Sequence, residues 1–104
     1  MADADTIRNE LNSALTGKNL SLDGNVKFDF DGTGVVYIDG STDSASVSGE
    51  DKDADCTVVM SVETWEKLKN EETDSTTEFF NGRIKIQGNM EIVMKLTQIF
   101  DSVK

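Results

Sequence analysis

The sequence predicts an α+β fold in which helices cover one face of an antiparallel or mixed sheet. Strand-like alternation is concentrated in the middle of the chain, and helical periodicity flanks it on both sides. The 104 residues contain no internal repeat, no linker and no proline, which suits a single core. We therefore expect one domain over residues 1–104, in the order helix, four strands, two short helices, strand and long helix.

A helix of about three turns is predicted at the start of the chain. Its apolar stripe consists of Ile7, Leu11, Ala14 and Leu15. Asp3 and Asp5 suit the positive end of the helix dipole, and Gly17 lies just past the expected last turn.

Two strands are predicted next. Val26, Phe28 and Phe30 alternate with polar residues, which is the period of a strand with one buried face. After a turn at 31–34, residues 35–38 are apolar on both faces. That pattern is expected for a strand covered on one side and partly shielded on the other.

The third and fourth strands differ in character. The segment 41–55 is rich in Ser, Asp and Gly, and Ala45 and Val47 suggest a short, exposed strand within it. The fourth strand, at 55–61, places Cys56, Val58 and Met60 on one face.

Two short helices are predicted after the fourth strand. Ser61 is a candidate N-cap, followed by Val62, Trp65 and Leu68 at spacings of three. A second helix start is expected at 75–78, where a serine and a glutamate have the spacing of a capping box.

The last elements are a strand at 83–87, with Ile84 and Ile86 on one face, and a helix from Met90 to about Val103. The main apolar arc of this helix consists of Ile92, Val93, Leu96, Ile99, Phe100 and Val103. Met90 and Met94 lie on a separate edge.

The charge balance excludes two classes of partner. The formal net charge of −10, from 20 acidic and 10 basic residues, disfavours nucleic acids and anionic membrane surfaces because both require Lys and Arg.

No apolar stretch approaches the roughly 20 residues of a membrane-spanning helix. One cysteine, and an N-terminus without an apolar run, predict a reducing compartment, the cytoplasm.

Residues for catalysis are scarce. The chain has no histidine, the usual general base and metal ligand. Cys56 alternates with apolar residues, which favours a buried hydrophobe over a nucleophile. The segment starting at Asp29 shares the glycine register of an EF-hand loop, but Gly40 stands where that loop needs glutamate. We expect no enzyme activity, no cofactor and no metal site.

The segment from Trp65 onward carries much apolar material. Its simplest interpretation is core packing. Met90 and Met94, however, lie off a helix arc that already suffices to cover a sheet, and methionine adapts to irregular or changing contents. A ligand pocket is therefore the second interpretation.

Three segments resemble the sterol carrier protein-2 family. The strongest is FFNGRIKIQGNM at 79–90, followed by MKL at 94–96, which is similar to the family segment that enters the last helix. ADCTV at 54–58 resembles a family strand, and residues 61–68 resemble the helix after it. The resemblance runs in matching order from about Val26 to Phe100. Arg83 replaces the family's lysine, and no proline precedes Phe79.

The resemblance implies a five-stranded, mostly antiparallel sheet covered on one face by helices, with an apolar tunnel between the layers. It also implies non-catalytic binding and transfer of fatty acids, fatty acyl-CoAs, phospholipids or sterols. The lipid-binding candidates carried over by position are Trp65, Leu68, Phe79, Phe80, Ile86, Met90, Val93 and Met94. Residues 101–104 differ from the family's peroxisomal signal, which again favours the cytoplasm.

Three functions stay open at this stage. A lipid carrier would use burial of ligand surface and requires an internal cavity. An acidic protein-interaction module with a solid core would dock a basic partner in a salt-sensitive way. A cofactor-free enzyme would rest on Asp and Glu alone. Arg83 and Lys85 are the cations that could meet a lipid head group, and both monomer and weak dimer are compatible with the sequence.

Overall fold

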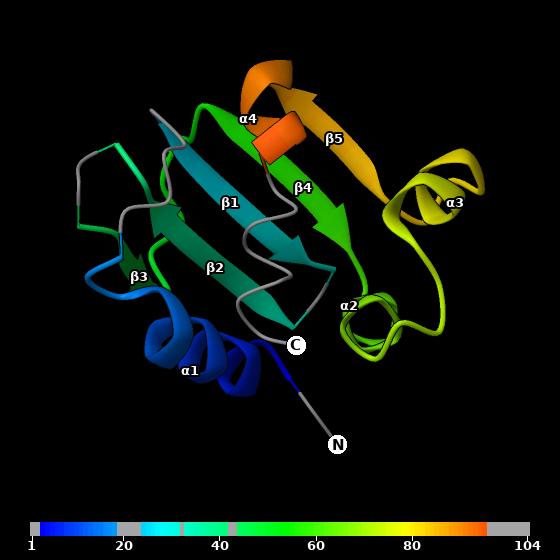
Figure 1. Ribbon diagram of the computed structural model, residues 1–104, viewed down its shortest axis with the longest axis horizontal. Helices are drawn as coiled ribbons and strands as arrows, with labels where there is room; N and C mark the ends of the chain where they lie inside the picture. Colours follow the sequence, from blue (N-terminus) through cyan, green and yellow to red (C-terminus); the bar gives the residue numbers. More distant parts are fainter. Residues whose placement is uncertain (1–2, 19–23, 32, 42–43, 96–104) are drawn as a thin grey trace.

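The computed structural model describes residues 3–18, 24–31, 33–41 and 44–95, and these form one sheet with helices (Figure 1). The strands are β1 (Asn25–Phe30), β2 (Gly34–Asp39), β3 (Ser46–Ser48), β4 (Cys56–Met60) and β5 (Lys85–Gly88). The helices are α1 (Ala4–Leu15), α2 (Val62–Lys69), α3 (Ser75–Phe80) and α4 (Met90–Lys95). The predicted order of elements is confirmed.

The sheet has the strand order β3-β2-β1-β4-β5. β1 pairs in parallel with β4, whereas the β1–β2, β2–β3 and β4–β5 pairings are antiparallel. The prediction of a five-stranded, mostly antiparallel sheet is therefore confirmed. The parallel pair arises because the chain leaves edge strand β3 and passes β2 and β1 before it starts β4, which is a crossover and not a hairpin.

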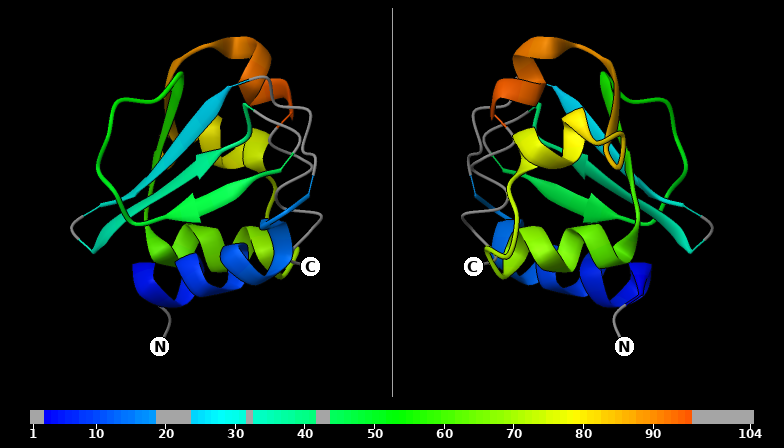
Figure 2. Two further views of the ribbon diagram at one scale, coloured as in Figure 1. Left: turned by 90° about the vertical axis from the view of Figure 1, so that its left-hand side faces the viewer. Right: turned by 90° about the vertical axis from the view of Figure 1, so that its right-hand side faces the viewer.

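One face of the sheet carries the core. Val26, Phe28 and Phe30 alternate with less buried residues along β1, as predicted. The rings of Phe28 and Phe30 meet the edge of Trp65 from α2, with centroids 5.5 and 5.8 Å apart, a favourable aromatic geometry. From α1 the buried residues are Ala4, Ile7, Leu11 and Leu15. Helices therefore cover this face (Figure 2).

The opposite face is crossed by the connection between β3 and β4, residues 49–55 (Figure 2). Lys27 of β1 forms an ion pair of 3.0 Å with Asp51. The ammonium of Lys52 lies 4.7 Å from the ring centroid of Tyr37, at a distance suited to a cation–π interaction. Tyr37 is consequently buried, which confirms the predicted partial shielding of β2.

The two short helices begin with different caps. Ser61 caps α2, because its hydroxyl oxygen accepts a hydrogen bond of 3.1 Å from the Thr64 backbone N–H. The predicted capping box at 75–78 is wrong: Asp74 caps α3 and accepts from the Thr77 N–H at 2.7 Å. A carboxylate one position earlier competes for the same free N–H groups, and Glu78 turns inward instead.

The last two elements follow the prediction with shifted bounds. β5 begins at Lys85, two residues later than expected, because the Arg83 N–H bonds back to the Glu78 carbonyl at 3.0 Å and closes the turn after α3. Ile84 is buried, and so is Ile92 on α4. The part of the predicted last helix beyond Lys95 lies outside the described residues. None of the helices in the described ranges has the length and hydropathy of a membrane span.

Candidate functional site

Four large apolar side chains of the described residues are exposed, and all of them flank β5. Their exposed fractions are 45% for Phe79, 80% for Phe80, 60% for Met90 and 81% for Met94. The two phenylalanines belong to α3 and the two methionines to α4, the helices at the two ends of β5 (Figure 1). Large exposed apolar side chains at both ends of one strand are candidates for a binding surface.

Ile86 lies between these two pairs. It is paired in register with Val58, a buried residue of β4, so both side chains point to the helix-covered face. Unlike Val58, Ile86 is only half-buried. We call Phe79, Phe80, Ile86, Met90 and Met94 the β5 apolar surface.

The remaining three predicted lipid-binding residues lie deeper. Trp65 and Leu68 are buried in the core, and Val93 of α4 is half-buried against it. The eight predicted residues thus form two groups, one around β5 and one buried in the core or packed against it. The tunnel expected to join them stays a prediction.

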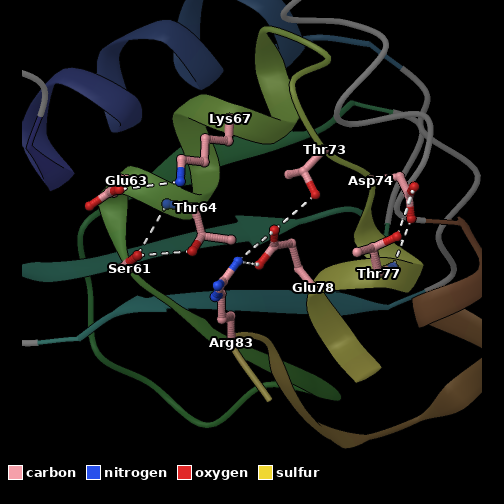
Figure 3. Close-up of polar contacts among 9 residues, drawn as sticks. All are labelled: Ser61, Glu63, Thr64, Lys67, Thr73, Asp74, Thr77, Glu78 and Arg83. Atoms are coloured by element: carbon pink, nitrogen blue, oxygen red, sulfur yellow. Dashed lines mark hydrogen bonds and ion pairs between the residues drawn. The ribbon is translucent and has the colours of Figure 1, made fainter. Parts of the chain in front are cut away.

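A separate, polar pocket of about 510 Å³ opens to solvent where the start of α2, the end of α3 and the start of β5 meet (Figure 3). Its charged lining residues are Asp31, Glu63, Lys67, Glu78, Arg83 and Lys85. We call it the α2–α3 pocket.

Glu78 is the buried charge of this pocket, with a side chain only 3% exposed. It accepts a hydrogen bond of 2.8 Å from the Thr73 hydroxyl, and the Arg83 Nη1 lies 3.1 and 3.3 Å from its two oxygens. The Thr73 hydrogen bond, and then Arg83, hold the pKa of Glu78 below its usual range against the opposing effect of burial. Glu78 is therefore anionic at neutral pH.

Two cations of the pocket differ in how firmly they are held. Lys67 pairs with Glu63 one turn earlier on α2 at 3.3 Å, and both side chains are largely exposed. Such a pair contributes little stability. Arg83 is 58% exposed and lies on the other side of Thr64 from Lys67 (Figure 3).

The sequence pattern predicted Glu78 as part of a helix cap, and the sequence did not predict this pocket. The available signal was the spacing of Glu78 and Arg83 across Gly82, which turns the chain with φ of +78° and so faces the two charges toward each other. Among the described residues, no group of three or more acidic or cysteine side chains is placed to hold a metal ion.

The arrangement defines a class of protein: a small α+β domain with helices on one face of a five-stranded mixed sheet and apolar side chains exposed around one edge strand. The family model of the SCP-2 sterol transfer family matches residues 6–101. The chain belongs to this family, as the resemblance predicted.

Individual relatives agree with this assignment. Sterol carrier protein 2 of Gallus gallus is 37% identical over 67 residues, which are 64% of this chain and 12% of the chicken protein. The chain thus spans only a small part of that relative.

Solved structures share the fold. Sterol carrier protein 2 of Yarrowia lipolytica, in its apo form, has a TM-score of 0.79 at 18% identity, over 94% of this chain and 89% of that chain. The sterol carrier protein domain 2 of Helicoverpa armigera has a TM-score of 0.64 at 23% identity, over 97% of this chain and 76% of that chain.

Proposed function

We propose that this domain binds an apolar lipid, without catalysis, against the β5 apolar surface and the inner residues behind it. The observation that carries the proposal is the exposure of Phe79, Phe80, Met90 and Met94 in a member of a sterol transfer family. Water contact with these side chains is unfavourable, and a lipid that covers them removes it.

The size of the surface restricts the ligand. β5 has four residues, so the two exposed pairs are separated by roughly 13 Å of strand at 3.3 Å per residue. A ligand that touches both pairs is at least that long, which suits a long fatty acyl chain, free or as its CoA thioester, or a sterol. Half-buried Ile86, between the pairs, contacts the middle of such a ligand.

The inner residues form the wall behind the ligand in this proposal. Val93 lies on α4 beside Met94 and packs against the core, while Trp65 and Leu68 come from α2. Methionines at the rim adapt to acyl and ring shapes at low cost because their side chains are unbranched and polarizable. One surface can therefore accept several lipids.

A non-catalytic role agrees with the chemistry of the chain. There is no histidine, and burial raises the pKa of the Cys56 thiol, which makes it a poor nucleophile at neutral pH. The proposed role is therefore to hold and pass on a lipid in the cytoplasm.

Titration of the delipidated protein with a fluorescent fatty acyl or sterol probe tests the proposal. We expect saturable one-to-one binding, a change in Trp65 emission, and displacement of the probe by oleate, palmitoyl-CoA or cholesterol in an order that ranks the ligands. Absence of saturable binding would overturn the lipid-carrier function. The net charge of −10 would then favour the acidic interaction module, whose binding to a basic partner weakens with salt.

A further inference from the structure

The α2–α3 pocket lies apart from the β5 apolar surface but shares α3 with it. Glu78 of α3 faces the pocket, while its neighbours Phe79 and Phe80 are exposed and outside the pocket lining. Lys85 points to the face of the sheet opposite Ile86, because successive residues of a strand alternate. The pocket therefore presents charge where the other surface presents apolar groups.

Three of the ten basic residues of an otherwise strongly acidic chain line this one pocket: Lys67, Arg83 and Lys85. Glu78 faces them from α3, but its charge is already compensated by the Arg83 guanidinium and the Thr73 hydroxyl. Asp31 and Glu63 are the other acids of the lining. Glu63 is 78% exposed, so solvent weakens its effect on a bound anion.

The donors needed for an anion are present. Arg83 contacts Glu78 through Nη1, and a guanidinium carries further N–H donors on Nη2 and Nε. Among the described residues, Lys85 makes no ion pair, and the ion pair of Lys67 is with exposed Glu63, although its charge also acts on Glu78. The two lysine side chains can turn to a new ligand at little cost, because exposed ion pairs contribute little stability.

We propose that the α2–α3 pocket binds a phosphate group through Arg83, Lys85 and Lys67, with Glu78 as the residue that positions the Arg83 guanidinium. Arg83 supplies paired N–H donors that match two phosphate oxygens, and the lysines act as point charges. The start of α2 lines the same pocket, so its dipole adds partial positive charge. The phosphate belongs either to the head group of the lipid, which rests on the proposed function, or to a free phosphate compound.

The first test is a titration of the ¹⁵N-labelled protein with inorganic phosphate at constant ionic strength, followed by backbone amide shifts. We expect saturable shifts at Thr64, Gly82, Arg83 and Lys85, and little change at Tyr37. Shifts that are absent, or that grow without saturation over the whole surface, would overturn the proposal.

Charge-removing variants identify the ligands. Arg83→Gln and Lys85→Gln should each weaken phosphate binding about tenfold or more. Lys52→Gln removes the same charge on the same sheet face but over β2, with two strands between it and β5, where Lys52 contacts Glu50 and Tyr37, and should change the affinity less than about twofold. Arg83→Gln leaves Thr73 as the remaining partner of Glu78 and so can lower stability. In that case the phosphate affinity of Lys85→Gln tests the proposal. Equal affinities in all variants would refute the assignment of these ligands.

A lysophosphatidate and a fatty acid of the same acyl length distinguish the two sources. If the lysophosphatidate displaces inorganic phosphate and also shifts Phe79 and Met94, the phosphate is a lipid head group. If phosphate binds but neither lipid displaces it, the pocket serves a free phosphate compound. If both lipids shift the β5 apolar surface and inorganic phosphate never binds, the pocket proposal fails and the lipid-carrier function stands.

Discussion

Phe80→Ser should separate lipid affinity from stability more clearly than any other single change. Phe80 is 80% exposed and caps no helix, so its loss should change the free energy of unfolding by less than about 0.5 kcal/mol. In the proposed complex, by contrast, the ring is covered by ligand. The substitution should therefore change the free energy of unfolding little and the free energy of lipid binding strongly.

The expected loss of affinity follows from the area involved. Full burial of a phenylalanine side chain contributes about 1.5–3 kcal/mol, and a ring that starts 80% exposed can gain most of that on binding. A loss of about 1.5–2 kcal/mol corresponds to a Kd raised about 10- to 30-fold. Met94→Ser, at the other end of β5, should act similarly, and the two effects should add because the sites do not touch.

The assay is displacement of a fluorescent acyl probe, together with urea denaturation of each variant. Val36→Ala is the matched control: Val36 is fully buried in β2, so it should lose about 2 kcal/mol of stability with the affinity of the folded protein unchanged. The reasoning would be refuted if Phe80→Ser bound the probe as tightly as the parent, or if its affinity fell only in proportion to the unfolded fraction.

Three further predictions concern the framework of the site. The pKa of Glu78 is lowered in the folded protein, so the anion stabilises the fold above the pKa of an unfolded glutamate. This contribution is lost as the pH falls through the lower pKa of the folded protein. Glu78→Gln should therefore flatten the melting-temperature profile between about pH 3 and 6. Ser61→Ala removes the N-cap of α2 and should cost about 1 kcal/mol in urea denaturation, whereas an unchanged midpoint would show that the cap is dispensable. Gly88→Ala should lower both stability and lipid binding in the same assays. Gly88 has φ of +107°, and an added Cβ would collide with the Asp55 backbone. A fully stable variant would contradict this prediction.

Local patterns were sufficient for most of the elements. The alternation of Val26, Phe28 and Phe30 predicted β1 and its buried face, and the spacing of Ile7 and Leu11 predicted the buried stripe of α1. In each case one face is buried, so the hydrophobic period and the structure coincide.

Features that depend on distant parts of the chain could not be read in this way. The parallel pairing of β1 with β4 depends on the path of the 49–55 connection, which no periodicity encodes. The α2–α3 pocket combines residues from Asp31 to Lys85. Even the capping residue of α3 was predicted one position too late, because Asp74 and Ser75 are both good caps and only the fold decides between them.

The sequence pattern did not show which of the predicted lipid-binding residues are exposed. Phe79 and Trp65 are both aromatic residues at helical spacing, yet one is 45% exposed and the other fully buried. What separates them is that Trp65 packs against Phe28 and Phe30 of the central strand β1, whereas α3 lies at the start of the edge strand β5 (Figure 1).

The position of β5 at the sheet edge has a consequence for motion. β5 is held to the sheet by a single ladder of four residue pairs with β4, whereas β1 has neighbours on both sides. Hydrogen bonds at such an edge open at lower free energy than those of the centre, so amides of β5 should exchange with solvent before those of β1. A lipid bound as proposed could then enter and leave by local opening of β5, while the meander of β1, β2 and β3 stays closed.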